Sequence, residues 1–209
     1  MTAELDTTQL VAIAAALGWA SGLRLYAVVF LTGMAGSLGW VPLPAGLHVL
    51  QQPAMLWASA ALWAVEFLAD KVPWVDSLWD AVHTFIRIPA GAALAYGVFG
   101  GDHAAWASVA ALVGGTLAAT AHTAKAATRA AANTSPEPFS NLALSLAGDA
   151  LVPGMLWLSW VHPVWFFFAL AAALLVMVVA VVALFNILRG LGAKLRGHFM
   201  PTRAGSKGS

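Results

Sequence analysis

Seven charged or titratable residues are concentrated in residues 66–92, between long apolar runs: Glu66, Asp70, Lys71, Asp76, Asp80, His83 and Arg87. If a helix begins at Asp76, then Asp76, Asp80, His83 and Arg87 follow at i, i+4, i+7 and i+11 and share one face. Carboxylates, an imidazole and a guanidinium on one face have the chemistry to pair with ions, to exchange protons or to hold a cation through oxygen ligands.

The composition defines the setting of this polar stripe. Of the 209 residues, 61% are hydrophobic and 9% are charged, whereas a soluble domain carries about 25% charged residues. The chain is therefore predicted to be an integral membrane protein, with room for about six helices of ~20 residues. A net charge of +1 gives no case for nucleic-acid binding, and the absence of Cys excludes disulfides and thiol catalysis.

The apolar runs predict an all-α, polytopic helical bundle. The first run lacks a cleavage-site pattern and is expected to be retained as a helix. Within it, Gly18 and Gly22 form a GxxxG that permits close packing, and the string WASGLRLY around Arg24 predicts a local break. Further along, Pro89 predicts a kink in the third helix, and Asp149 and Pro153-Gly154 predict an interruption of the fifth. The expected helices are residues 10–36, 54–70, 76–99, 104–131, 139–160 and 164–188.

The cations predict how the bundle is oriented. Residues 189–203 are basic and are expected on the cytoplasmic side. Six spans would then place both termini in the cytoplasm, in a multi-pass protein of the cell inner (plasma) membrane. Residues 1–189 are predicted to form one transmembrane domain, and residues 190–209 a basic cytoplasmic tail with a disordered end. Two halves of three spans would also allow a 3+3 inverted repeat.

Several ionisable residues fall deep inside these expected helices. At ~1.5 Å per residue, Arg87 and Asp149 lie roughly 15 Å from the starts of their helices. Because isolated charges there are costly, Asp149 is expected to pair with Arg87 or Arg24. The predicted substrate or ion pathway comprises Arg24, Glu66, Asp70, Asp76, Asp80, His83, Arg87, Lys125, Arg129, Asn141 and Asp149.

Three strings give the chain a wider resemblance: ASGLRLY, EFLADKVPWVDSLWDAVHTFIRIPAGA and KAATRAAANTSPEPFSN. Over roughly residues 8–188 the chain resembles a bacterial multi-pass membrane family, domain of unknown function 4126. The resemblance implies that most of the charged positions above belong to the family pattern. It also implies an acidic pair after the third string, where this chain has Gly148 and Asp149. It implies no particular activity.

Three functions compete on these residues. The first is a transporter or channel-like protein for an ion or small polar solute, with His83 suited to proton coupling. The second is a lipid-handling or structural protein, in which Arg87 and Asp149 form an ion pair, Asp80 and His83 satisfy each other, and no catalysis occurs. The third is an enzyme acting on a phosphorylated lipid.

The three functions imply different partners. Only the enzyme requires a cofactor, Mg²⁺ held by Asp76 and Asp80, with Lys125 and Arg129 on the phosphate. Membrane lipids are expected partners in every case, a small solute or ion in the first, and the small-residue faces permit a homo-oligomer.

Overall fold

The computed structural model describes residues 5–72, 74–100, 103–133 and 138–199, with the backbone alone for residues 133, 138–141, 187–188 and 190–199. The regular secondary structure of these residues is entirely helical: α1 (Thr7–Ser37), η1 (Ala45–Gln51, a 3₁₀ helix), α2 (Pro53–Ala69), α3 (Val75–Phe99), α4 (Ala104–Asn133), α5 (Pro138–Val161) and α6 (Pro163–Phe199). The predicted all-α bundle is confirmed.

Local sequence signals mark several of the helix ends. Asp6 caps α1 by accepting a hydrogen bond from the Gln9 backbone, and the Gln9 side chain accepts one from the Asp6 backbone in return. Pro53 and Pro163 open α2 and α6, where a missing N–H costs nothing. Gly100 ends α3 with a φ of 64°, a backbone angle that favours glycine.

Five helices are long and apolar enough to cross a membrane: α1, α3, α4, α5 and α6. The fold is therefore a helical membrane bundle. The sixth expected span corresponds to α2, which has 17 residues. At 1.5 Å per residue it is about 25 Å long, somewhat less than the ~30 Å hydrocarbon core.

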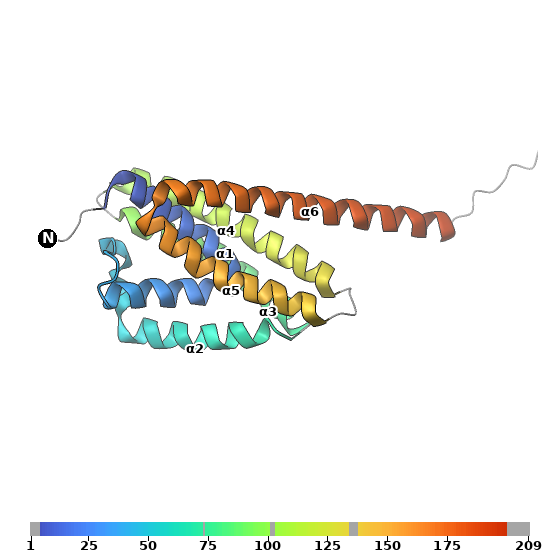
Figure 1. Ribbon diagram of the computed structural model, residues 1–209, viewed down its shortest axis with the longest axis horizontal. Coiled ribbons are helices and arrows are strands. Elements are labelled where there is room, and N and C mark those ends of the chain that lie inside the picture. Colours follow the sequence, from blue (N-terminus) through green and yellow to red (C-terminus); the bar gives the residue numbers. More distant parts are fainter. Residues whose placement is uncertain (1–4, 73, 101–102, 134–137, 200–209) are drawn as a thin grey trace, which may run out of the picture.

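The long first helix is interrupted at Arg24, which has φ −147° and ψ 78°. The chain reverses there, so that α1 consists of two arms lying as a hairpin (Figure 1). Hydrogen bonds confirm the arrangement, because both outer ends of the hairpin contact Trp160 at the end of α5. The Gln9 amide donates to the Trp160 carbonyl (3.2 Å), and the Trp160 indole donates to the Pro42 carbonyl (3.2 Å). The predicted break is confirmed at this residue.

The hairpin changes the predicted topology. The first apolar run is predicted to cross the membrane once, whereas α1 enters and leaves at one end of the bundle. The start of α1 and the far end of α6 consequently lie at opposite ends of the molecule (Figure 1). The predicted orientation of the two termini in the membrane stays a prediction. The 3+3 inverted repeat is not confirmed, since it would require three crossings in the first half.

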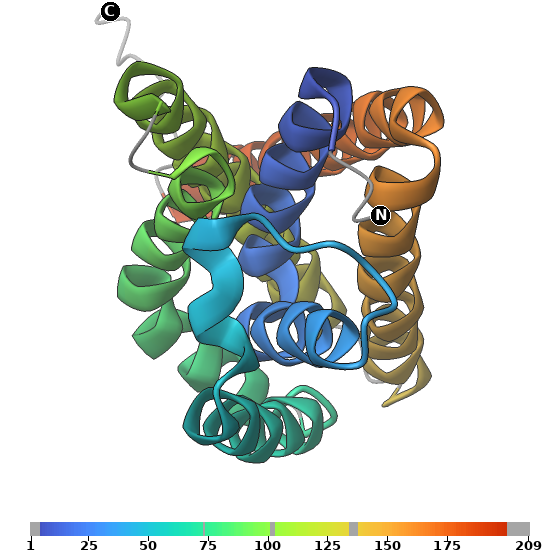
Figure 2. The same ribbon diagram turned by 90° about the vertical axis from the view of Figure 1, so that its left-hand side faces the viewer.

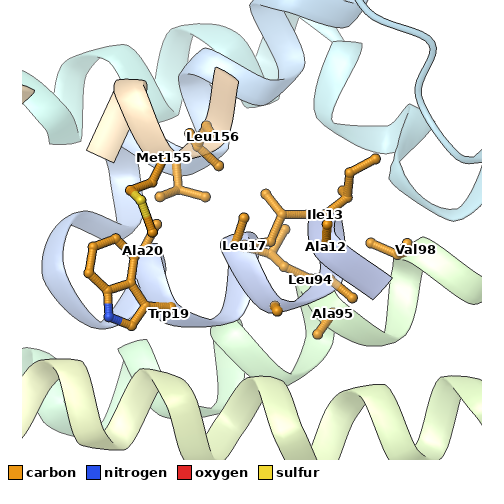
Figure 3. Close-up of a cluster of buried hydrophobic side chains, with 14 of the residues drawn as sticks. Ala12, Ile13, Leu17, Trp19, Ala20, Leu94, Ala95, Val98, Met155 and Leu156 are labelled. Carbon is orange, nitrogen blue, oxygen red and sulfur yellow. The ribbon is translucent and has the colours of Figure 1, made fainter. Parts of the chain in front are cut away.

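The first arm of α1 forms the centre of the bundle. Figure 2 shows it between α3 and α4 on one side and α5 on the other. Its side chains Ile13, Leu17 and Trp19 are fully buried, and the close-up in Figure 3 shows them with Leu94 of α3 and Met155 of α5. This arm supplies most of the apolar core, so its length fixes where Arg24 lies.

The GxxxG of the first arm packs within the chain itself. A Cβ placed on Gly18 would lie 2.5 Å from the Gly114 Cα of α4, and one on Gly22 would collide with the Ala118 carbonyl. Close packing at these glycines is therefore confirmed, with α4 as the neighbour. This face of the hairpin is occupied in the single chain.

Two helices continue past an internal proline. The structure has α3 continuous past Pro89 and α5 continuous past Asp149 and Pro153, so the predicted interruption of α5 is wrong. The last helix is longer than predicted, because α6 continues beyond Leu188 to Phe199. The side chains of its final turns and the predicted disordered end lie outside the described residues.

Candidate functional site

The tip of the α1 hairpin carries Arg24, whose side chain is only 2% exposed. At this interruption of the helix, the Leu23 carbonyl accepts a hydrogen bond from the Lys125 ammonium of α4 (3.2 Å). A broken backbone inside a membrane bundle requires such partners, since hydrocarbon provides none. The tip therefore presents both a guanidinium and a backbone oxygen to the interior of the protein.

Arg24 links α1 to two other parts of the bundle. Its Nη1 lies 2.6 Å from the Asp70 carboxylate, at the end of α2, and its Nε lies 2.9 Å from the Asp149 carboxylate of α5. Its Nη2 also donates to the carbonyl and hydroxyl oxygens of Ser145, both at 3.0 Å. Of the two partners predicted for Asp149, the structure therefore has Arg24 and not Arg87.

The Asp70 carboxylate is shared among three cations. Besides Arg24, it lies 3.2 Å from the Lys125 ammonium and 3.4 Å from the Arg129 guanidinium. The Arg129 side chain also donates to the Asp70 carbonyl (2.5 Å) and to the Asp76 carboxylate at the start of α3 (3.1 Å). The connection between α2 and α3 is thus fastened to α4 through buried charges.

A second group of charges surrounds Arg87, whose side chain is fully buried in α3. Its guanidinium donates to Glu66 of α2 (2.7 Å) and to Asp80, two turns earlier in α3 (2.6 Å). Lys125 lies 3.0 Å from the same Asp80 oxygen. Since Lys125 also contacts Asp70, it joins the two groups into one network.

The charges of this network balance among the described residues. Five cations and five carboxylates contact one another, and their formal charges cancel. We call this set the ion network; it consists of Arg24, Lys71, Arg87, Lys125, Arg129, Glu66, Asp70, Asp76, Asp80 and Asp149. Among the described side chains, those of η1 and α6 contribute none of these residues.

The most exposed part of the ion network is the pair of Lys71 and Asp149. Their side chains are 23% and 18% exposed, and they lie 3.5 Å apart. Partial burial lowers the pKa of the Lys71 ammonium from its ordinary value, while nearby Asp149 opposes this shift. These two residues form the rim through which the ion network meets the surroundings.

His122 belongs to the site although the predicted pathway omits it. The Thr84 hydroxyl donates to the Asp80 carbonyl (2.9 Å), so it accepts from His122 Nε2 (2.7 Å). The other ring nitrogen, Nδ1, then faces the Arg87 guanidinium as an acceptor (3.3 Å). The sequence signal for His122 was its spacing on one face of α4 with Lys125.

His83 lies beside the ion network and not within it. Its Nδ1 donates to the Trp79 carbonyl (2.8 Å), so its Nε2 accepts from the Tyr26 hydroxyl (3.0 Å). Its ring also stacks on Trp79 with centroids 3.9 Å apart. The reading in which Asp80 and His83 satisfy each other is therefore wrong, because Asp80 pairs with Arg87 and Lys125.

The metal prediction for Asp76 and Asp80 stays a prediction. The structure gives the two carboxylates different cationic partners, Arg129 for Asp76 and Arg87 with Lys125 for Asp80. In the part of the chain that the structure describes, no group of three His, Asp or Glu is arranged to hold a metal ion. The side chain of Asn141, another predicted pathway residue, lies outside the described residues.

Two cavities border the ion network on either side of α4. One, of about 190 Å³, lies between α3 and α4 and is lined by Asp80, Thr84, His122 and Arg129 among others. The other, of about 290 Å³, lies among α1, α4, α5 and α6, and its charged lining residues are Arg24, Lys125 and Arg129. Arg129 thus borders both.

Comparison with known proteins places the chain in a family. The sequence model described as Domain of unknown function (DUF4126) matches residues 11–183. The chain belongs to this family. The match covers all of the described ion network, so the network lies within the family's own domain. No curated protein and no solved structure matches the chain.

Proposed function

We propose that this membrane protein moves an ion or a small polar solute across the bilayer by way of the ion network. The observation that carries the proposal is the broken hairpin of α1, whose tip places Arg24 in a buried, charge-balanced network beside two cavities. Interrupted helices that end at buried polar sites are a recurrent feature of membrane transporters.

Energetic considerations favour a working site over a purely structural one. Buried ion pairs contribute little stability relative to apolar packing of the same volume, and each charge inside a membrane is costly. If these positions only stabilised the bundle, apolar residues such as Leu17 and Ile13 would do so at least as well. Ten charged groups in one interior are better explained by a function that uses them.

The two ends of the bundle differ in how far they expose the ion network, which indicates from which side a solute would reach it. The ion network reaches the surroundings at Lys71 and Asp149, while α1 packs closely on α4 at Gly18, nearer the other end. We therefore expect one side to be open and the other sealed. Because the seal is a helix arm, transport would require the α1 hairpin to shift against α3 and α4.

The test is solute flux through proteoliposomes that contain the purified full chain. Vesicles are challenged osmotically with potassium chloride, potassium phosphate, sodium gluconate or glycerol, with an ionophore carrying the counter-ion, and recovery is followed by light scattering. The variant Asp149→Asn keeps the side-chain shape but removes the rim carboxylate. We expect its flux to fall at least about tenfold.

The matched control is Asp6→Asn, the same substitution at the opposite end of the bundle. Asn caps a helix about as well as Asp, so this variant should keep full flux. If no solute crosses faster than in empty vesicles, or if Asp149→Asn and Asp6→Asn behave alike, the transport proposal is wrong. The structural alternative would then be favoured, and it predicts that apolar replacement of a whole ion pair is tolerated.

A further inference from the structure

The cavity among α1, α4, α5 and α6 has a one-sided charge distribution. Its volume is about 290 Å³, and its charged lining residues are all cations: Arg24, Lys125 and Arg129. The facing walls come from α5 and α6 and include Leu151 and Met177. An amphipathic cavity of this kind has a positive wall and a wall of low polarity.

The carboxylates that neutralise these cations do not line the cavity. Asp70 contacts all three, at 2.6, 3.2 and 3.4 Å, yet it is fully buried and does not line the cavity. Each cation also has a carboxylate of its own, Asp149 for Arg24, Asp80 for Lys125 and Asp76 for Arg129, but none of these carboxylates lines the cavity, so its charged wall is cationic. The potential inside the cavity is therefore expected to attract an anion and to repel a cation, and the apolar walls strengthen this preference.

One carboxylate competes for the Arg24 edge of the cavity. Asp149 lies 2.9 Å from Arg24 Nε, and it is the most exposed acid of the ion network. It also contacts Lys71 at the rim, so it would keep a cationic partner on leaving Arg24. Because the described network is already neutral, an incoming anion would replace this carboxylate and not add to it.

A glycine provides space at the same edge. A Cβ on Gly148 would lie 3.6 Å from Arg24 Nε, which is an ordinary contact. An alanine is therefore tolerated by the fold, but its methyl group would occupy the position where an anion approaches Arg24. On the same helix, a Cβ on Gly154 would meet no atom within 4 Å, so Gly154→Ala is the matched control.

We propose that this cavity binds a phosphate group through Arg24, Lys125 and Arg129, which names the class of solute for the transport function proposed above and rests on it. Arginine matches phosphate oxygens with paired N–H donors, and lysine adds a point charge. The volume is about ten times the share of one water molecule in the liquid, which is ample for a phosphate with some hydration.

The phosphate has two sources. A third cavity, of about 340 Å³, lies between α4 and α6 and shares Ala124 and Met177 with the cavity lined by the three cations. Its walls include Val178, Val181 and Val182, so it suits the hydrocarbon chain of a phospholipid. A free phosphate ion would use only the cavity lined by the three cations. Both sources bring the same chemistry to the three cations.

The experiment measures ligand-induced thermal stabilisation of the full chain in a neutral detergent, followed by tryptophan fluorescence. Sodium phosphate is compared with sodium chloride at equal ionic strength, and phosphatidic acid with phosphatidylcholine. At saturation we expect phosphate or phosphatidic acid to raise the melting temperature by about 5 °C. Stabilisation by inorganic phosphate identifies a free ion, and stabilisation by phosphatidic acid alone identifies a lipid.

The variants test the site itself. Gly148→Ala should weaken the apparent affinity at least about tenfold, and Gly154→Ala should leave it unchanged; both should melt like the unaltered protein without ligand. Asp149→Asn removes the competing carboxylate and should tighten phosphate binding severalfold, although its flux is expected to fall. Stabilisation that chloride matches, or that Gly148→Ala retains in full, overturns the inference.

Binding and flux separate this inference from the function on which it rests. Flux of sodium or glycerol without phosphate binding would leave the transport proposal standing and would remove the phosphate site. The protein could instead bind phosphate, with binding weakened by Gly148→Ala, and pass no solute. That result would support the phosphate site and reject the transport proposal.

Discussion

Removal of Arg87 should destabilise the protein through one particular neighbour. In Arg87→Met the guanidinium is lost while Glu66 and Asp80 remain buried. Asp80 keeps the Lys125 ammonium at 3.0 Å, whereas the described contacts of Glu66 end at Arg87. Breaking a buried ion pair by removing one partner costs about 3–5 kcal/mol. Since ~1 kcal/mol shifts the melting temperature of a chain this size by about 2–4 °C, the expected decrease is roughly 6–20 °C.

The second substitution identifies the source of this cost. Adding Glu66→Gln to Arg87→Met removes the unpaired charge and should restore most of the lost stability. Adding Asp80→Asn should restore much less, because Asp80 still has Lys125 and its loss would leave that ammonium with fewer partners. Melting curves of the single and double variants in one detergent, followed by tryptophan fluorescence, give both comparisons.

The outcome that would refute this reasoning is specific. If Arg87→Met melts within about 2 °C of the unaltered protein, the pair contributes less than buried-charge energetics require. If Asp80→Asn rescues as well as Glu66→Gln, the division of partners between Arg87 and Lys125 is not the one described. Either result would show that the interior is more hydrated than its buried side chains indicate.

Two further predictions concern the α1 hairpin. Because the chain has no Cys, single cysteines report topology cleanly: Thr8→Cys and Trp40→Cys should react with an impermeant maleimide from one side of the membrane, and Val72→Cys from the other. Labelling of the first two from opposite sides would exclude the hairpin. Gly22→Ala should lower the melting temperature clearly, since its Cβ would collide with a backbone carbonyl of α4, while Gly154→Ala should not; equal melting of the two variants would contradict the close α1–α4 packing.

Much of the fold follows from residue types and spacing. The apolar runs predict the helices to within a few residues, except for the end of α6, because most runs are long enough to fill a membrane span and are bounded by Pro, Gly or charged residues. The stripe Asp76, Asp80 and Arg87 was predicted to face inward, and the structure buries all three. Helical periodicity alone is sufficient for this inference.

Partners could not be assigned from the sequence, because pairing depends on which helices become neighbours. The choice between Arg24 and Arg87 for Asp149 was open until the hairpin placed Arg24 beside α5. In the sequence, His122 is only a neighbour of Lys125 on one face of a helix. Its contact with Arg87 depends on the packing of α3 against α4, which no local pattern encodes.

Hydropathy and helical period are properties of neighbouring residues, so the amino-acid sequence is enough to predict a helical membrane protein with an unusual number of ionisable groups in its interior. The tertiary structure alone decided that the first helix turns back at Arg24. A break permits a bend of any size, and only packing against α3, α4 and α5 selects a full reversal. That reversal brings the charges of five helices and the α2–α3 connection together, and it leaves the cavities beside them.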